Sequence, residues 1–274
     1  MKRLFFGTAG IPISTVKGAT VEGIKRVKSL GLGSMELEFV RSIYLKGKNI
    51  LEVKKTAEKE KIILTAHAPY YINLNSNEKK KIEASKKRIL DTAKVADAVG
   101  AYSICFHGGY YMKQDPRKVL LKVKKEMKDI IKKAKDLNVW IRLETTGKKS
   151  SFGTLDEILE LSREFVKVLP CIDFAHLYAR SNGKLNGFED FKEVLAKVEK
   201  SLGKKGLKNM HCHASGIAYS EKGEKHHLVL AESKFDYRGL CKALKEFNAK
   251  GVLISESPNI EKDALKMKKF YESL

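Results

Sequence analysis

Residues whose side chains can bind metal ions recur along the chain, each time at or just after the end of a short apolar run. Five of the seven histidines of the sequence lie in such places, and His226 and His227 lie in the long loop that follows the seventh run. The segments are Ala66-His67-Ala68, Phe106-His107-Gly108, Leu143-Glu144-Thr145, Ile172-Asp173-Phe174-Ala175-His176, Met210-His211-Cys212-His213, Glu224-Lys225-His226-His227 and Ser255-Glu256-Ser257. Imidazoles mixed with carboxylates, without a thiolate pattern, suit Zn²⁺ first and Mn²⁺ or Fe²⁺ next.

Four carboxylates, those of Glu144, Asp173, Glu224 and Glu256, would be crowded together if these segments met in space. A single histidine at a strand end is more often a hydrogen-bonded structural residue than a ligand. The whole set is different, because converging carboxylates without counter-ions are costly unless cations neutralise them. The pattern therefore predicts a site for several divalent ions.

The elements that must position these residues follow from the alternation of two patterns. Short β-type runs are expected at 3–7, 34–39, 62–66, 102–106, 139–143, 170–173, 207–211 and 251–255. Helical spacing separates them, at about 20–30, 47–60, 78–99, 116–136, 154–167, 187–202, 236–248 and 259–272. Strict alternation indicates parallel βαβ units, and eight of each favours a closed (β/α)8 TIM barrel over an open doubly wound sheet.

In such a barrel the strand ends that carry the candidate ligands meet at the C-terminal rim, where catalytic groups are found. No linker or repeat divides the chain, so residues 1–274 are expected to form one domain. The longest stretch without a regular pattern, about 212–235, follows the seventh expected strand. A loop of that length inside a compact domain is usually functional.

Lysine and arginine outnumber aspartate and glutamate by 54 to 33, which gives a net charge of +21. A folded protein this basic attracts polyanions, of which nucleic acid is the commonest in cytoplasm. The lysine runs 79–81 and 86–88 could contact phosphates, although such runs are more often solvated helix faces. A Lys/Glu-rich surface with a single glutamine, Gln114, also fits a thermophilic source.

The four cysteines, Cys105, Cys171, Cys212 and Cys241, are widely spread and form no Cys-x-x-Cys pair. They are expected to be reduced, small buried side chains rather than a disulfide framework or a four-thiolate zinc site. No apolar run is long enough to cross a bilayer, and the basic N-terminus breaks at Gly7 before a signal-peptide core can form. The expectation is a cytoplasmic protein without a membrane partner.

Two segments carry a resemblance to a known family. His67-Ala68-Pro69-Tyr70-Tyr71-Ile72-Asn73-Leu74 is similar to the His-x-x-Tyr-x-Ile-Asn-Leu segment of endonuclease IV, and Cys171-Ile172-Asp173-Phe174-Ala175-His176 matches that family's Ile-Asp-x-x-His signature. The order of candidate ligands from about His67 to Glu256 also resembles endonuclease IV, a family of trinuclear-zinc apurinic/apyrimidinic (AP) endonucleases with a xylose-isomerase-like TIM barrel.

The resemblance implies about three Zn²⁺ ions per chain. His67 and His107 would hold the first, with Glu144 bridging it to a second that Asp173, His211 and Glu256 complete. His176, Glu224 and His226 would hold the third. Glu144 and Glu256 would be the catalytic residues in hydrolysis of the phosphodiester bond 5′ to an abasic site in DNA, by a monomer without an organic cofactor.

Tyr70 and Tyr71 would enter DNA at the lesion, where an aromatic wedge offsets unstacking, and Arg41 is a weaker candidate for the same surface. Alternatively, one of the tyrosines packs on the rim. Several positions depart from the family pattern and indicate a divergent member. Glu224 stands where the family has Asp, His213 stands in place of Asn, Gly108-Gly109 follows His107 in place of Pro-Gly, and Ala231-Glu232-Ser233 stands in place of Gly-Glu-Gly.

Two other functions remain open from the sequence. A metal-dependent sugar isomerase or epimerase of the same barrel superfamily would need only one or two ions. A non-catalytic module could bind damaged DNA through loops that metal ions stabilise. The number of bound ions and metal-dependent nicking of DNA would separate these alternatives from the nuclease.

Overall fold

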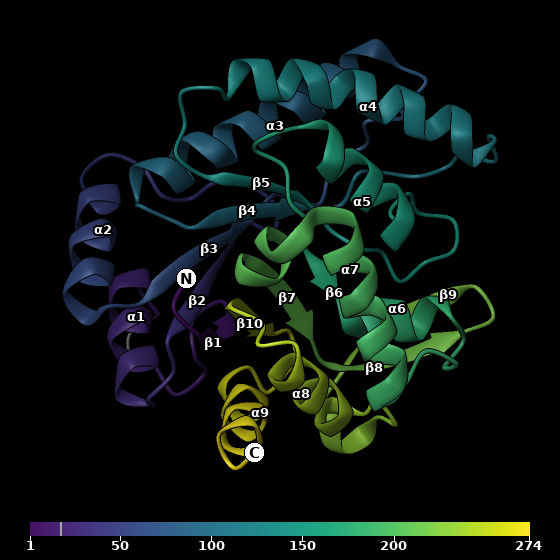
Figure 1. The fold of residues 1–274 in the computed structure, drawn as a ribbon. Helices are drawn as coiled ribbons and strands as arrows, with labels where there is room; N and C mark the ends of the chain where they lie inside the picture. Colours follow the sequence, from purple (N-terminus) through teal and green to yellow (C-terminus); the bar gives the residue numbers. More distant parts are fainter. Residues whose placement is uncertain (17) are drawn as a thin grey trace.

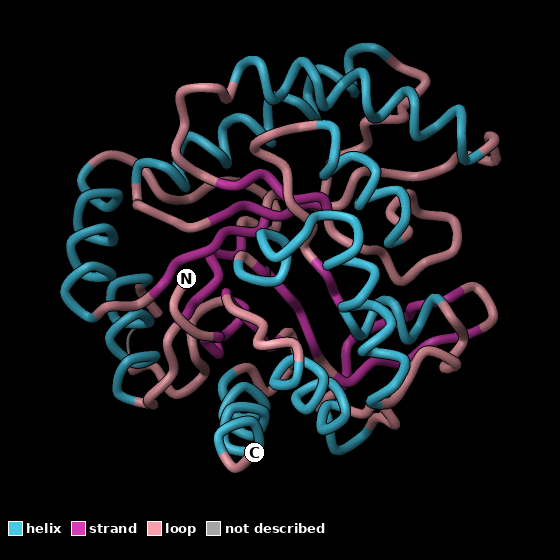
Figure 2. The backbone as a smooth tube through the Cα atoms, viewed as in Figure 1, coloured by secondary structure: helices cyan, strands magenta, loops and turns pink. Residues whose placement is uncertain are grey.

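The computed structural model describes residues 1–16 and 18–274, and within them eight parallel strands form one sheet surrounded by helices (Figures 1 and 2). The order of strands in the sheet is β5-β4-β3-β2-β1-β10-β7-β6. The strands are β1 (Leu4–Ala9), β2 (Ser34–Glu38), β3 (Ile63–His67), β4 (Ser103–Phe106), β5 (Trp140–Leu143), β6 (Ile172–Asp173), β7 (Met210–Ala214) and β10 (Gly251–Ser255).

The two end strands of this sheet meet and close it. The backbone N–H of Cys171 donates to the carbonyl of Leu143 at 2.9 Å, and the N–H of Thr145 donates to the carbonyl of Cys171 at 3.0 Å. Isolated parallel bridges join Ile141 to Val168 and Glu144 to Cys171. The predicted (β/α)8 barrel is confirmed, with a short seam between β5 and β6.

Helices cover the outside of the barrel (Figure 1). Those over the predicted segments are present, and one short helix directly after β6 was not predicted. The helices are α1 (Thr20–Ser29), α2 (Lys48–Glu60), α3 (Lys79–Ala98), α4 (Pro116–Lys133), α5 (Leu155–Glu164), α6 (Phe174–Arg180), α7 (Phe188–Lys208), α8 (Tyr237–Glu246) and α9 (Glu261–Glu272). None of these described helices is long and apolar enough to span a bilayer.

Local sequence explains where individual helices begin and which face they bury. The carboxylate of Asp115 caps α4 by accepting from the N–H of Lys118, and Pro116 takes the first turn, where its missing N–H costs nothing. Thr154 and Glu157 form a capping box at the start of α5. The fully buried residues of α4 recur at helical spacing and pack on the core: Val119, Val123, Met127 and Ile130.

Lys86 does not lie on a solvated face of α3, as the run 86–88 suggested. Its side chain is only 8% exposed, and its Nζ lies 3.1 Å from Glu126 and 3.0 Å from Asp129 on α4. Glu83 completes the cluster at 2.7 Å. Lys86 therefore joins two helices and is not free to contact a phosphate.

The seventh strand and the loop after it differ from the expected layout. α7 continues past Gly203, which adopts a positive φ of 65°, as far as Lys208, so β7 begins at Met210 rather than at 207. The stretch 212–235 is not irregular. It contains the end of β7, an antiparallel hairpin of β8 (Gly216–Ser220) and β9 (Gly223–Leu228), and the 3-10 turn Leu230–Glu232.

Candidate metal centre

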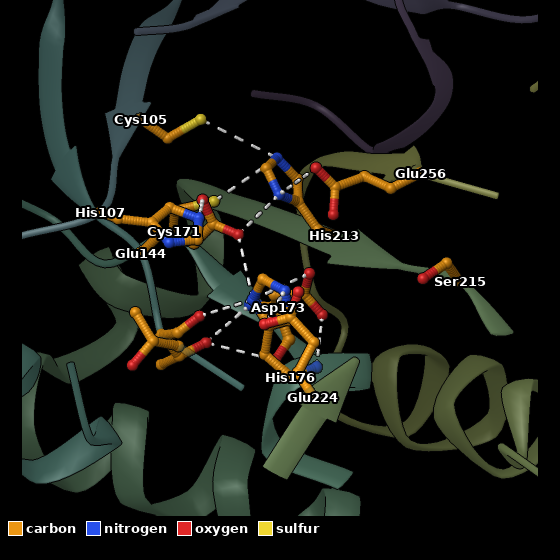
Figure 3. A network of polar contacts seen from close by, with 12 residues as sticks. Cys105, His107, Glu144, Cys171, Asp173, His176, His213, Ser215, Glu224 and Glu256 are labelled. Atoms are coloured by element: carbon orange, nitrogen blue, oxygen red, sulfur yellow. Dashed lines mark hydrogen bonds and ion pairs between the residues drawn. The ribbon is translucent and has the colours of Figure 1, made fainter. Parts of the chain in front are cut away.

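A cavity of about 390 Å³ opens at the C-terminal rim of the barrel, where the candidate ligands gather. Its walls come from loops after six strands and from the β8–β9 hairpin. The polar residues that line it include Glu38, His67, His107, Lys148, His176, Glu224, Lys225, His226, His227 and Glu256. Figure 3 shows how several of these side chains and their buried neighbours point toward one another.

The first ligand group consists of His67, His107 and Glu144. The Oε2 atom of Glu144 lies 3.1 Å from His67 Nε2 and 3.2 Å from His107 Nε2. The Nδ1–H of His67 donates to the carbonyl of Ala68 at 2.8 Å, so its Nε2 lone pair is directed at the site. These are the residues that the resemblance assigns to a first ion.

The second group consists of Glu144, Asp173, His213 and Glu256. The other oxygen of Glu144, Oε1, lies 3.2 Å from His213 Nδ1, and Glu256 Oε1 lies 3.3 Å from the same nitrogen. Asp173 is also the N-cap of α6, because its Oδ1 accepts from the N–H of His176 at 2.8 Å. Glu144 thus presents one oxygen to each of two adjoining groups, which is the arrangement of a bridging carboxylate.

The third group consists of His176, Glu224 and His227. His176 Nε2 lies 3.5 Å from Glu224 Oε2, while the Nδ1–H of His176 donates to the carbonyl of Thr145 at 2.9 Å. Glu224 arrives from the hairpin, which docks against the loop after β5 through the N–H of Glu224 and the carbonyl of Gly147. A Cβ atom on Gly147 would lie only 2.6 Å from the Cβ of Glu224, so a glycine is required there.

His227 takes the place in this group that the resemblance gives to His226. The reason is a β-bulge, because Ala218 pairs with His226 while Tyr219 pairs with Glu224, which leaves Lys225 as an extra residue. The extra residue reverses the alternation of faces, so Glu224 and His227 share one face. His226 is exposed at the mouth of the cavity.

His213 likewise takes the place that the resemblance gives to His211. β7 extends to Ala214, and His213 is in register with Asp173 at the rim. His211 lies two residues deeper, where its Nε2 is 2.9 Å from Glu36 Oε2 and its Nδ1 is 2.9 Å from Ser103 Oγ. It is therefore not among the residues grouped around Glu144, Asp173 and Glu256.

Glu36 and Glu38 on β2 were not among the residues predicted from the sequence. Glu36 is fully buried. Glu36 Oε1 lies 2.9 Å from His213 Nε2, on the side of the ring opposite to Glu144. One signal was available, since Ser34-Met35-Glu36-Leu37-Glu38 places two carboxylates at alternate positions of an otherwise apolar strand. Such residues face the barrel interior, where an acidic side chain needs a partner.

Electrostatic coupling decides the protonation of the site when no cation is bound. Burial opposes ionisation of Glu144, but His107 and His213 hold its pKa well below the ordinary value. Burial lowers the pKa of His67, yet Glu144 more than reverses this and raises it to about 10. Burial raises the pKa of Glu256 well above its usual range. The carboxylates of Asp173 and Glu144 raise it further, although His213 acts to lower it. Protons on the imidazoles thus supply the positive charge that the carboxylates require.

Several buried polar atoms at the rim lack partners, which is the mark expected of residues that hold metal ions. Asp173 Oδ2, His176 Nε2 and Glu256 Oε2 make no hydrogen bond to any described residue, although they are buried. Each such buried group calls for an explanation, and for these three, which lie together with other candidate ligands, a bound ion is one that fits. The donor set, imidazole nitrogens and carboxylate oxygens, fits Zn²⁺, Mn²⁺ or Fe²⁺.

The three residues expected to touch DNA lie on loops at the same end of the barrel. Tyr70 and Tyr71 are 60% and 62% exposed, and Tyr70 also lines the cavity. Arg41 is exposed beside Val40, whose carbonyl accepts from the N–H of Tyr70 at 3.1 Å. Arg41 is not among the described residues that line the cavity.

The fold and the rim define the class of protein, a TIM barrel with histidines and carboxylates gathered at its catalytic end. The family described as xylose isomerase-like TIM barrel matches residues 24–274, and the chain belongs to this family. An uncharacterized protein of Methanocaldococcus jannaschii is 46% identical over 273 residues, which cover 99% of this chain and 98% of that protein.

More distant relatives confirm the resemblance to endonuclease IV. A protein described as "Probable endonuclease 4" from Aquifex aeolicus is 28% identical over 221 residues, or 76% of this chain and 77% of the relative. The crystal structure of endonuclease IV from Thermus thermophilus matches with a TM-score of 0.74 at 18% identity, over 97% of this chain and 100% of that one. A D-tagatose 3-epimerase-like protein matches with a TM-score of 0.73 at 20% identity, over 97% and 96% of the two chains.

Proposed function

We propose that this protein is a zinc-dependent hydrolase that cleaves the phosphodiester bond 5′ to abasic sites in DNA. The observation that carries the proposal is the position of Glu144, whose two oxygens face two adjoining ligand groups while a third group lies beside them. Metal sites that share a carboxylate are suited to an in-line displacement at phosphorus. About three ions per chain would account for the three rim groups.

When bound, the cations would lower the pKa of water and offset the negative charge of the reacting phosphate. The chain's own residues would do the rest. Glu256 Oε2 is buried and without a partner, so it can accept a hydrogen bond from the attacking water and orient it. Lys148 and Lys225 line the same cavity and can attract a phosphate.

Affinity for DNA is supported by the aromatic loop and by the charge of the molecule. Tyr70 and Tyr71 present exposed rings beside the cavity, where they can stack on bases next to a lesion, and Arg41 lies on the neighbouring loop. The net charge of +21 favours binding to a polyanion. We further propose that the protein acts as a cytoplasmic monomer without an organic cofactor.

The test is incubation of the chelated protein with a duplex that contains one abasic site, with and without added Zn²⁺ or Mn²⁺. We expect incision 5′ to the site only after metal is restored. Glu144→Gln should reduce the rate by at least about 100-fold, because the charge shared between two ion sites is lost. Glu232→Gln, a change on the exposed surface, is the matched control and should retain the parent rate.

Two results would contradict the proposal. One is a parent protein that carries its full complement of metal and still leaves the abasic duplex intact. The other is a Glu144→Gln variant that cuts as fast as the parent, since the bridging role would then be excluded.

A sugar epimerase is the second candidate, and one observation favours it. Glu144, Asp173, His213 and Glu256 alone form a four-residue group that could hold a single ion. One or two ions per chain, together with solvent-hydrogen exchange into a ketose and no incision of DNA, would establish this alternative. About three ions with incision would exclude it.

A further inference from the structure

A second set of metal-binding side chains lies inside the barrel, beneath the rim groups. Cys105 on β4, Cys171 just before β6, and His211 and His213 on β7 are each fully buried. Figure 3 shows the contacts of the Cys105 and Cys171 sulfur atoms with the His213 ring, and Glu256 on the other side of that ring. Two thiols and two imidazoles are the donor set of tetrahedral Cys₂His₂ zinc sites.

We propose that Cys105, Cys171, His211 and His213 bind an additional metal ion of the thiophilic class that includes Zn²⁺. This site lies beneath the rim groups, shares His213 with one of them, and requires no assumption about the reaction. It also gives Cys105 and Cys171 a role other than that of small buried hydrophobic residues, while Cys212 and Cys241 keep that role.

The distances from His213 Nε2 to the other three donor atoms are close to those expected around one ion. With Zn–S near 2.3 Å and Zn–N near 2.0–2.1 Å, neighbouring ligand atoms of a tetrahedral site lie about 3.3–3.8 Å apart. His213 Nε2 lies 3.3 Å from His211 Nε2, 3.7 Å from Cys171 Sγ and 3.9 Å from Cys105 Sγ. All four donor atoms are within 4.8 Å of one another.

The hydrogen bonds of the cluster leave room for a cation. The Nε2 atoms of His211 and His213 face each other, and one proton at most can lie between them. Ser103 Oγ, 2.9 Å from His211 Nδ1, can accept from that nitrogen and so free Nε2 for a metal, as groups behind ligating histidines commonly do.

Glu36 adds a negative charge at the same place. Its Oε2 is 2.9 Å from His211 Nε2 and 3.5 Å from Cys105 Sγ. Its Oε1 is buried and lacks a hydrogen bond of acceptable geometry, despite lying 2.9 Å from His213 Nε2. A carboxylate and two potential thiolates in a dry interior need a compensating positive charge. The adjacent imidazoles can supply it as protons in the metal-free chain, and a bound ion would supply it in their place.

The ring of His213 would join the inner site to the rim. Its Nε2 faces the inner donors, whereas its Nδ1 faces Glu144 and Glu256, so the two sites do not compete for one atom. Ions on both nitrogens would leave the ring as imidazolate and release its proton to solvent. An inner ion would then hold the ring in the orientation that the rim group needs.

The experiment uses the full chain, stripped of metal and titrated with Co²⁺. A thiolate bound to Co²⁺ gives an intense charge-transfer band in the near ultraviolet, while ions held by nitrogen and oxygen ligands give only weak bands in the visible range. The rim groups contain no sulfur, so the ultraviolet band reports the inner site alone. We expect the parent protein to show this band.

A matched pair of double variants locates the band. Cys105→Ser/Cys171→Ser should lose it and bind one ion fewer, with the visible bands of the rim retained. Cys212→Ser/Cys241→Ser removes two other buried thiols, leaves both inner cysteines in place, and should keep the band. A parent protein that takes up Co²⁺ with visible bands and no sulfur band would overturn the proposal, and this result does not depend on any variant folding. Persistence of the band in Cys105→Ser/Cys171→Ser would overturn it equally.

Discussion

At the scale of single residues, we expect His67 and Glu144 to link the stability of the protein to its metal content. The pKa of His67 rises from an ordinary 6.5 to about 10 in the folded, metal-free chain because Glu144 outweighs the effect of burial. A raised pKa means that the charged imidazole stabilises the fold fully below pH 6.5, and that this contribution is lost as the pH rises through about 10.

We therefore expect the chelated protein to lose stability steadily between pH 6.5 and about 10. Metal binding requires unprotonated imidazole, so the loaded protein should not show this loss. Urea unfolding at several pH values, with and without Zn²⁺, measures the stability of the chelated and the loaded protein. In the chelated protein, His67→Asn should reduce the fall of the unfolding free energy with rising pH. If this free energy fell equally with pH in the chelated and loaded forms, the assignment of His67 as a ligand would be contradicted.

Some residues of the candidate site could be predicted from the sequence because of the residues that surround them, and others could not. His67, His107 and Glu144 were recognisable because each stands where an apolar run ends. His67 is the last residue of β3, and the other two directly follow β4 and β5. Glu36 was not recognisable, because a carboxylate within a strand is ordinarily assigned to the solvent face. Only the closed barrel shows that its face is the interior, opposite His211.

At the scale of elements, one extra residue in β9 decides which histidine joins the group formed with His176 and Glu224. The bulge at Lys225 puts His227 beside His176 and Glu224, and it leaves His226 exposed. Substitution of the two histidines separately tests this register. His227→Ala should lower the metal content by about one ion per chain and the activity by at least about 100-fold.

His226→Ala is the matched control and should keep the metal content of the parent, measured by elemental analysis after gel filtration. If His226→Ala lost an ion and His227→Ala did not, His226 would be the ligand, as the Glu-x-His spacing implies. Equal losses in both variants would mean that the hairpin has no fixed register in solution.

Periodicity could not have predicted either change of register. The shift of β7 arises because α7 continues to Lys208 beyond the kink at Gly203, and glycine is normally taken as a helix end. The bulge arises where the hairpin docks on Gly147, a contact between segments far apart in sequence. Both result from packing between distant segments. The alternation of strands and helices depends on local residue patterns, and it was predicted for nearly the whole chain.

At the scale of the whole molecule, the charge of +21 should make binding to DNA depend strongly on salt. Each phosphate neutralised by the protein releases condensed counterions, so affinity falls as salt rises. We expect the affinity for an abasic duplex to fall by about 10³-fold between about 50 mM and about 200 mM salt. Fluorescence anisotropy measures it on the Glu144→Gln variant, which is expected to cut slowly.

The control for this prediction is an intact duplex of the same sequence. Its affinity should show a similar salt dependence but a lower value at every salt concentration, because the abasic site is the cheapest position to extrude. Binding that does not change with salt would contradict a role for the basic surface.

The seam that closes the barrel has a consequence of its own. β5 and β6 are joined there by a few backbone hydrogen bonds, and Glu144 and Cys171 pair directly across it. Each of the two belongs to a different proposed ion site, one at the rim and one inside. Bound ions would therefore act as cross-links between the first five strands and the last three, and their removal would open the barrel at this line first. Amide hydrogens of Thr145 and Cys171 would then exchange with solvent faster than those between any other two strands, and metal supply would govern how tightly the two parts of the chain are held together.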